Sequence, residues 1–333
     1  MTNQRQLGNP ARNPLDVLTR PARGPDLVLR YGDGAEHVAD VHLPRSVAPA
    51  PWIDGAAAER AGTGGMAPGT GGPAPLTGGP VPGTGGLAPL TIFLHGGFWR
   101  AEYGREHTAP LAEALADAGF AVCAPEYRRT GQPDGGWPGT FDDVAAAVDR
   151  LPRLVAQAAG GVIDLDRVVL AGHSAGGHLA LWAASRHLLP AESPWRAQEP
   201  AGRSVVALAA VSDLAASYRW RLGQRATEAL MGGGAEYYPD RYDAVDPSRL
   251  VPAGVPVRLV HGTGDDRVPW HMSLDYAVRA RTSGTTGVLA PTCVLLPGTG
   301  HFELIDPLSA EWPQVVAAFR AVAGFGESDR VVE

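Results

Sequence analysis

The stretch Val168-Val169-Leu170-Ala171-Gly172-His173-Ser174-Ala175-Gly176 decides the fold of this chain of 333 residues. Its first three residues form an apolar run typical of a buried strand, and the residues from Ala175 to Ala184 favour a helix. Between them lies a G-x-S-x-G motif, which is a weak signal by itself. A strand, a sharp turn and a helix are, however, the context that a nucleophilic serine on such a motif requires. We therefore predict that Ser174 is a nucleophile.

Strand and helix patterns alternate on both sides of this stretch. Most of the strand runs are apolar throughout, which is typical of parallel strands covered on both faces. The sequence thus predicts an α/β fold with a mainly parallel central sheet and helices on both faces. The expected strands are residues 90–94, 120–125, 167–172, 205–211, 257–262 and 292–297, and the expected helices are 105–118, 140–151, 175–184, 270–281 and 308–323.

A glycine- and proline-rich segment interrupts this pattern near the N-terminus. A seven-residue repeat such as G-T-G-G-P-A-P runs four times between Gly62 and Pro89. The repeat has too few large apolar side chains to offset the conformational entropy that the chain would lose on ordering. We therefore predict a disordered insertion at about 47–88. Before it, two β-rich runs flank Gly32-Asp33-Gly34 and predict a hairpin. We expect one domain over 26–325, a flexible N-terminus over 1–25 and a tail over 326–333.

Composition excludes several classes of function. The net charge of −7 argues against nucleic acid as a partner, because a basic patch would be needed. No stretch approaches the roughly 20 apolar residues of a membrane span, and the first twenty residues contain no apolar signal region. Cys123 and Cys293 lie in apolar runs and are expected to be free thiols, which fits a reducing compartment. We expect a cytoplasmic protein with no cofactor and no metal.

A nucleophilic serine needs a base, and the base needs an acid that orients it. His301 lies in P-G-T-G-H-F, a loop between the last predicted strand and the last helix. Asp265 and Asp266 follow the penultimate strand in H-G-T-G-D-D-R-V-P, and Asp213 follows an earlier one. We prefer Asp265, with Asp266 as the closest alternative. All these residues lie just past the C-terminal ends of strands, where open α/β sheets place their sites.

Acyl transfer also needs hydrogen-bond donors for an oxyanion. The amide of Ala175 follows the nucleophile at a helix N-terminus, and His95-Gly96-Gly97 follows the first buried strand. Gly96 and Gly97 allow the backbone to approach a substrate closely. We therefore predict an oxyanion hole at Gly96, Gly97 and Ala175, with His95 bracing the loop by hydrogen bonds.

Aromatic residues supply candidates for a substrate pocket. Phe98 and Trp99 follow the glycine pair, and Trp220, Tyr237, Tyr238 and Tyr242 lie in the less regular stretch 215–250, which is long enough for a partial lid. The candidate pocket residues are Phe98, Trp99 and Trp220. Each of these aromatic side chains has packing in the core as its alternative role.

At these motifs the sequence resembles the α/β-hydrolase superfamily. More narrowly, H-G-G-F-W and G-H-S-A-G-G-H-L are similar to the esterase and arylformamidase branch, which includes kynurenine-formamidase-like and feruloyl-esterase-like proteins. The resemblance covers roughly residues 26–325, and the repeat is a departure from it. It implies a serine hydrolase that cleaves a small carboxylic ester, aryl amide or formamide through an acyl-enzyme, with Ser174, Asp265 and His301 as its triad.

Two other functions remain open. A peptidase of the prolyl-oligopeptidase type shares the H-G-T-x-D-D segment at 261–266, although no propeller domain precedes it here. A catalytically silent binding protein could also keep the fold. The complete Ser, Asp and His set argues against that second alternative.

Overall fold

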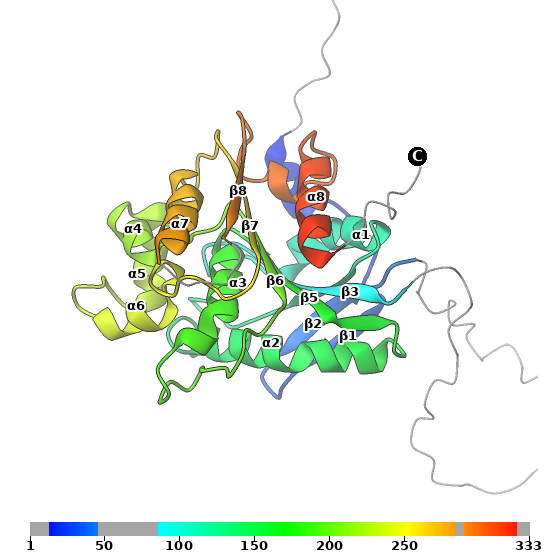
Figure 1. Cartoon of the computed structure of the whole chain (residues 1–333), viewed down its shortest axis with the longest axis horizontal. Coiled ribbons are helices and arrows are strands. Elements are labelled where there is room, and N and C mark those ends of the chain that lie inside the picture. The colour runs from blue at the N-terminus through cyan, green and yellow to red at the C-terminus, as the bar shows by residue number, and fades with distance from the viewer. Residues whose placement is uncertain (1–12, 46–85, 284–289, 325–333) are drawn as a thin grey trace, which may run out of the picture.

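The computed structural model describes residues 13–45, 86–283 and 290–324. Its centre is an eight-stranded sheet in the order β1-β2-β4-β3-β5-β6-β7-β8, shown in Figure 1. β1 pairs antiparallel with β2, and β2 pairs antiparallel with β4, whereas all the other pairs are parallel. The predicted α/β fold with a mainly parallel sheet is therefore confirmed. The strands are β1 (Leu27–Arg30), β2 (Val38–His42), β3 (Ala88–Leu94), β4 (Ala121–Pro125), β5 (Ile163–His173), β6 (Ser204–Leu208), β7 (Val257–Gly262) and β8 (Thr292–Leu296).

Alternating side chains of the central strands fill two separate cores. In β5, Leu170 belongs to the core on one face of the sheet, while Val169 and Ala171 belong to the core on the other. The same alternation separates Val205 from Val206 in β6. Successive side chains of a strand point to opposite faces, so a strand buried on both sides must be apolar at every position.

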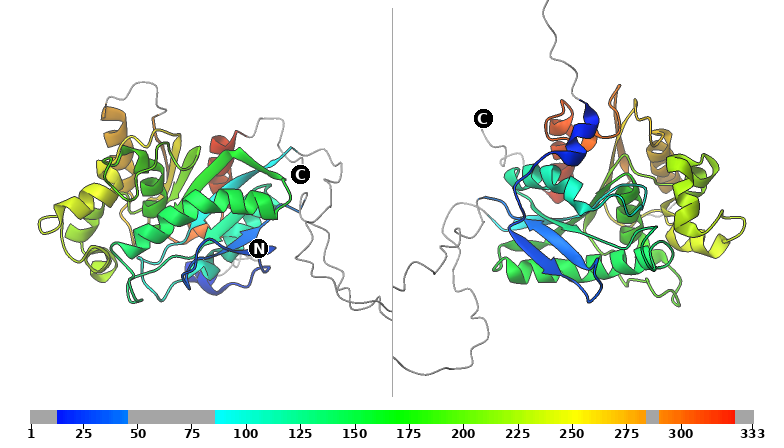
Figure 2. Two further views of the ribbon diagram at one scale, coloured as in Figure 1. Left: turned by 90° about the horizontal axis from the view of Figure 1, so that it is seen from below. Right: turned by 180° about the vertical axis from the view of Figure 1, so that it is seen from behind.

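Helices cover both faces of the sheet, as the sequence predicts (Figures 1 and 2). On one face lie α1 (Ala109–Asp117) and α8 (Trp312–Ala323), whose apolar residues share a core with Phe93 of β3. On the other face lie α2 (Gly139–Ala158) and α3 (Ala175–Ser185). α3 is buried along its whole length, which explains why its sequence is apolar on every side.

The remaining helices follow β6 and β7. α4 (Leu214–Arg219), α5 (Leu222–Met231) and α6 (Pro239–Val245) occupy the stretch that the sequence left irregular, and α7 (His271–Thr282) precedes β8. These four helices lie together on one side of the molecule in Figure 1. Short 3-10 helices complete the described secondary structure at Pro14–Thr19, Arg105–Thr108, Arg186–Leu188, Pro247–Arg249 and Glu303–Ile305.

Residues 13–25 differ from the predicted flexible N-terminus. Val17 of the first 3-10 helix is fully buried in the core beneath α1 and α8. The guanidinium of Arg20 forms a double hydrogen bond with Asp306, one arm of which measures 2.9 Å. These contacts tie residues 13–25 to the C-terminal part of the fold. Residues 1–12, almost all of the predicted insertion at 47–88 and the whole of the predicted tail at 326–333 lie outside the described residues.

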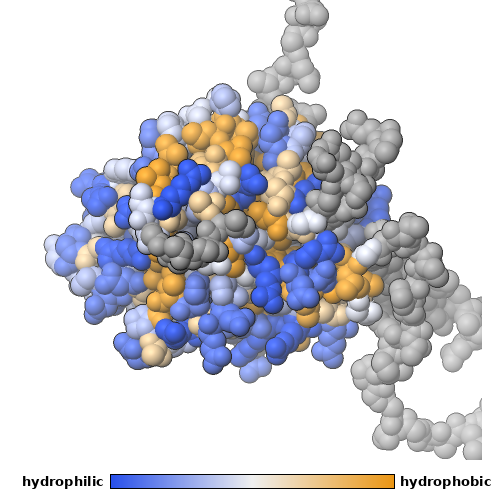
Figure 3. Space-filling model, viewed as in Figure 1, coloured by the Kyte–Doolittle hydropathy of each residue, from blue (hydrophilic) through white to orange (hydrophobic). Residues whose placement is uncertain are grey.

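The described surface is mixed in polarity. Hydrophilic side chains dominate the lower part of the face in Figure 3, over α2, and apolar ones gather higher up, over α7 and β8. Both cysteines are free thiols, as predicted, with Cys123 buried and Cys293 half-buried. No helix among the described residues is long and apolar enough to cross a bilayer. Within the same residues, no cluster of three or more His, Cys, Asp or Glu side chains has the arrangement of a metal site.

Candidate active site

Ser174 occupies a sharp turn between β5 and α3. Its backbone has φ 57° and ψ −117°, a strained conformation for a residue with a side chain. A Cβ atom at Gly172 would collide with the carbonyl oxygen of Gly176, and one at Gly176 would collide with that of Leu94. Both glycines of the motif are therefore required by the close packing of the turn.

Backbone hydrogen bonds hold this turn against the next strand. The N–H of Ser174 donates to the carbonyl of Leu208 at 2.8 Å, and its carbonyl accepts from His178 at 3.1 Å and from Val211 at 3.2 Å. The turn is thus fixed by β6 and by the first turn of α3. Strained backbone persists only where surrounding contacts determine it, and such residues cluster at functional sites.

Asp265 and His301 meet at the same edge of the sheet. Nδ1 of His301 donates to Oδ2 of Asp265 at 2.6 Å, joining the loop after β7 to the loop after β8. The side chain of Asp265 is fully buried, whereas that of Asp266 is 76% exposed and pairs with Arg267. The geometry therefore favours Asp265 over Asp266 as the partner of His301.

The carboxylate of Asp265 is held in its charged form. Burial alone would raise its pKa, but hydrogen bonds from His261, from His301 and from the amide of Val268 outweigh burial and lower the pKa far below its usual range. A permanently charged carboxylate fixes the proton of His301 on Nδ1 and leaves Nε2 free to accept a proton.

The turn at Ser174 and the loop of His301 are in contact through His173. Nε2 of His173 donates to the carbonyl of His301 at 3.0 Å, and the two rings lie 4.4 Å apart. Among the described residues, Oγ of Ser174 makes no hydrogen bond with His301. Such hydrogen bonds are often long in hydrolases without substrate and shorten in the complex.

The glycine loop after β3 lies directly beside Ser174. A Cβ atom at Gly96 would lie 2.9 Å from the carbonyl oxygen of His173 and 3.3 Å from Cβ of Ser174. Gly97 has φ 109°, which disfavours any residue with a side chain. Ala175 is buried at the first position of α3. Gly96 and Ala175 therefore both lie next to Ser174, and Gly97 follows Gly96 in the same loop.

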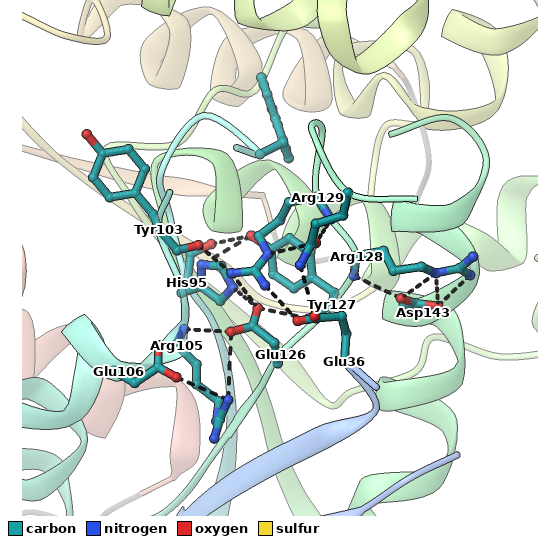
Figure 4. A network of polar contacts seen from close by, with 12 residues as sticks. Glu36, His95, Tyr103, Arg105, Glu106, Glu126, Tyr127, Arg128, Arg129 and Asp143 are labelled. Atoms are coloured by element: carbon teal, nitrogen blue, oxygen red, sulfur yellow. Dashed lines mark hydrogen bonds and ion pairs between the residues drawn. The ribbon is translucent and has the colours of Figure 1, made fainter. Parts of the chain in front are cut away.

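The side chain of His95 braces the glycine loop through hydrogen bonds and ring stacking (Figure 4). Its side chain is fully buried, with Nε2 2.8 Å from Oε1 of Glu126 and Nδ1 2.8 Å from the carbonyl of Gly96. The ring stacks on Tyr127 at 4.3 Å, and the Tyr127 hydroxyl donates to the His95 carbonyl at 2.7 Å. The predicted bracing role of His95 agrees with these contacts.

Glu126 completes the support of His95, although no sequence motif marked this residue. The carboxylate is buried and also accepts hydrogen bonds from the amide of Arg105 at 3.0 Å and from that of Tyr127 at 3.1 Å, while the guanidinium of Arg129 lies 3.2 Å away. Burial by itself would raise the pKa of Glu126, but the nearby His95 and Arg129 and these hydrogen bonds lower it to about 2. The only signal in the sequence was its position directly after β4.

The aromatic candidates take different places. Trp99 is completely buried and its ring meets that of His178 at 5.3 Å, so packing in the core describes its role. Phe98 is half-buried and packs against Gly223. Trp220 is 47% exposed and lines a small cavity together with Asp213. The volume of this cavity is about 20 Å³, which is room for about one water molecule.

A larger groove of about 790 Å³ lies elsewhere on the surface. It runs between the start of α2, the residues around 190–195 and α6, and its walls include Trp137, Trp195, Tyr238 and Arg241. Ser174, Asp265 and His301 are not among the residues that line it. A hydrolytic site needs its nucleophile within reach of the substrate. We therefore place the candidate site at the strained turn and the Asp265–His301 pair, and not in this groove, although the groove is large.

Comparison with protein families and relatives agrees with the fold and its motifs. The BD-FAE family model matches residues 81–278. "Esterase LipQ" of Mycobacterium tuberculosis (strain ATCC 25618 / H37Rv) is 28% identical over 229 residues, covering 65% of this chain and 51% of that protein. "Probable carboxylic ester hydrolase LipM" of the same organism is 33% identical over 97 residues, or 29% of this chain and 21% of that protein. The chain thus spans about half the length of the first relative and less of the second.

Solved structures share the fold at low sequence identity. A truncated carbohydrate esterase from gut microbiota has a TM-score of 0.64 at 18% identity, with 91% of this chain and all of the other covered. Esterase B from Lactobacillus rhamnosis has a TM-score of 0.62 at 19% identity, with 91% and 89% covered. At such identities the likeness establishes the α/β-hydrolase fold alone.

Proposed function

The chain belongs to the BD-FAE family, and we propose that it is a serine hydrolase that cleaves carboxylic esters through an acyl-enzyme intermediate. The observation that carries this proposal is the hydrogen bond of 2.6 Å between His301 and Asp265, in a loop that contacts the strained turn at Ser174. The names of the two curated relatives, an esterase and a probable carboxylic ester hydrolase, support an ester as the substrate.

In the first half of the reaction, Oγ of Ser174 attacks the ester carbonyl while Nε2 of His301 removes the hydroxyl proton. The charge on the carbonyl oxygen is stabilised by the amides of Ala175 and of the Gly96-Gly97 loop, each donor being worth ~10²–10³ in rate. Collapse of the tetrahedral intermediate breaks the bond to the alkoxide, which leaves as an alcohol with the proton from His301. The acyl group remains on Ser174.

In the second half, water replaces the alcohol. His301 takes a proton from the water, whose oxygen attacks the acyl carbonyl, and the same amides hold the second oxyanion. The proton then returns to Oγ of Ser174 as the carboxylic acid departs. Asp265 remains ionised throughout and stabilises the imidazolium form of His301.

An ester is favoured over an aryl formamide as the substrate. The formamidase alternative drew on the aromatic pair Phe98-Trp99 beside the oxyanion loop, but Trp99 is fully buried and offers no surface to a substrate. Phe98 alone remains within reach of the loop.

The test compares p-nitrophenyl acetate with N-formylkynurenine, using the wild-type protein and Ser174→Ala. We expect hydrolysis of the acetate, and we expect the Ser174→Ala variant to lose ~10⁴-fold or more in kcat/KM. Ser185→Ala is the matched control, because Ser185 is a buried serine at the far end of the same helix, and its hydroxyl donates to the carbonyl of Leu181 at 2.9 Å.

The outcomes separate the alternatives. Preference for N-formylkynurenine would favour the formamidase, and turnover of a peptidyl p-nitroanilide alone would favour the peptidase. Equal behaviour of wild type and Ser174→Ala, together with no covalent labelling of Ser174 by a fluorophosphonate, would leave a catalytically silent fold and refute the proposal.

A further inference from the structure

A second buried histidine contacts the carboxylate of Asp265. His261, the penultimate residue of β7, has a fully buried side chain whose Nε2 lies 3.2 Å from Oδ2 of Asp265. The same nitrogen lies 3.0 Å from the carbonyl oxygen of Val268, and Nδ1 lies 2.7 Å from Oγ of Ser273 on α7. Asp265 is therefore held between two imidazoles, His261 on one side and His301 on the other.

These contacts determine which nitrogen of His261 carries the proton. A backbone carbonyl can only accept, so Nε2 must be the N–H donor that is shared between Val268 and Asp265. In the neutral ring, Nδ1 is then an acceptor, and the hydroxyl of Ser273 donates to it. Ser273 is fully buried, so this hydrogen bond fixes the orientation of the ring from the side opposite to Asp265.

Four N–H groups surround the Asp265 carboxylate. Oδ1 accepts from the amides of Arg267 and Val268, both at 2.8 Å, while Oδ2 accepts from His301 at 2.6 Å and lies 3.2 Å from Nε2 of His261. The two histidines compete for the same oxygen. Each hydrogen bond that a carboxylate accepts lowers the basicity of the carboxylate. A less basic Oδ2 gives less stabilisation to a neighbouring imidazolium.

We propose that His261 is a positioning residue of the hydrolase, which holds the carboxylate of Asp265 toward His301 and limits how strongly that carboxylate stabilises protonated His301. This inference rests on the proposed serine-hydrolase function. His261 touches no reacting atom, and it acts only through Asp265.

Other ionisable groups around this site are few. The His173 ring faces His301, but burial and then the proximity of His301 lower the pKa of His173 well below its usual value, so it remains neutral. The carboxylate of Glu303 lies beside Gly300. Asp266 and Arg267 are exposed or half-exposed and pair with each other at 3.3 Å. Within the described residues, none of these groups forms a hydrogen bond or an ion pair with His261, whose partners are Ser273, Val268 and Asp265.

The test is the pH dependence of kcat/KM for p-nitrophenyl acetate in the full-length protein. His261→Leu removes the donor to Oδ2, and we expect the acidic limb of the profile to move upward by roughly half to one pH unit as protonated His301 is stabilised. His261→Gln places an amide N–H near the position of Nε2, and we expect it to return the limb most of the way to the wild-type pH. A histidine that only fills space would change the melting temperature without moving the limb.

Two further variants guard against misfolding and non-specific effects. Ser273→Ala removes only the hydrogen bond to Nδ1 of His261, and we expect a smaller upward movement of the limb, so it serves as the test if His261→Leu does not fold. His42→Leu is the matched control, because His42 is a buried histidine at the end of β2 that pairs with Val122 of β4; its replacement should leave the limb in place.

The inference is overturned if His261→Leu, or Ser273→Ala in its place, keeps the limb within about 0.2 pH units of the wild type. It is also overturned if His42→Leu moves the limb as far as His261→Leu does. Failure of the proposed function looks different, because Ser174→Ala would then retain wild-type turnover and no variant profile would report on His301.

Discussion

Replacing Glu126 with glutamine removes the charge that supports the loop at Gly96 and Gly97. The carboxylate of Glu126 lies 2.8 Å from Nε2 of His95 and 3.2 Å from the guanidinium of Arg129, and only 3% of its side chain is exposed (Figure 4). Glutamine has nearly the same shape, but its amide nitrogen would face donors that it cannot accept from. His95 would then lose the partner that fixes the loop carrying Gly96 and Gly97.

Two independent routes give the magnitude. The pKa of Glu126 is about 2, against 4.5 for a free glutamate, and at 1.36 kcal/mol per pH unit this difference is worth about 3 kcal/mol. Removing one partner of a buried ion pair typically costs about 3–5 kcal/mol. We therefore expect Glu126→Gln to lower the free energy of unfolding by about 3 kcal/mol at pH 7.

The sign of the pH dependence follows from the direction of the shift. A carboxyl whose pKa is lowered by folding stabilises the protein fully above its unfolded pKa, and it loses that contribution as the pH falls through the folded value. For Glu126 the window runs from about pH 4.5 down to about pH 2. The glutamine variant should lack this part of the acid sensitivity.

Urea denaturation at pH 7 and at several acidic pH values measures both effects, with Glu192→Gln on an exposed loop as the matched control. Turnover of p-nitrophenyl acetate should fall about tenfold or more because the loop donors lose their alignment. A Glu126→Gln protein that unfolds at the same urea concentration as Glu192→Gln would refute the reasoning, and so would an unchanged acid profile.

Three further substitutions probe other parts of the fold. Gly176→Ala drives a methyl group into the carbonyl of Leu94, so we expect turnover to fall ~100-fold or more, measured against the fraction of folded protein by circular dichroism. Asp265→Asn removes the acceptor for Nδ1 of His301 and should lower kcat/KM at neutral pH by ~10³–10⁴-fold, with a retained far-ultraviolet spectrum. Arg20→Ala breaks the ion pair with Asp306 and should lower the melting temperature by ~2–4 °C without changing kcat; an unchanged melting temperature would mean that this ion pair adds no stability.

Local patterns predicted those features that local contacts determine. The strand, turn and helix around Ser174 could be read from the sequence because their residues are neighbours and two glycines are needed for the turn. The meeting of Asp265 with His301 was also predictable, since parallel strands bring the loops at their C-terminal ends to one edge. Their catalytic roles remain proposals.

Features that depend on distant contacts could not be predicted in the same way. His95 and Glu126 are 31 positions apart, and Arg20 and Asp306 are 286 apart, with no periodic pattern to connect them. The burial of Trp99 likewise depends on α2 and α3 packing over β3. Tertiary packing selects these partners after the elements have formed, so a single sequence contains no signal for them.

The antiparallel placement of β2 determines where the connection between residues 45 and 86 joins the fold. His42 at the end of β2 pairs with Val122 near the start of β4, and Ala88 lies at the start of β3. Residues 45 and 86, which flank this connection, therefore lie near the N-terminal ends of β3 and β4, whereas Ser174 follows the C-terminal end of β5. Since doubling the length of a flexible loop costs only about 0.6 kcal/mol, we expect a change in the number of residues between 45 and 86 to leave the geometry around Ser174 unchanged.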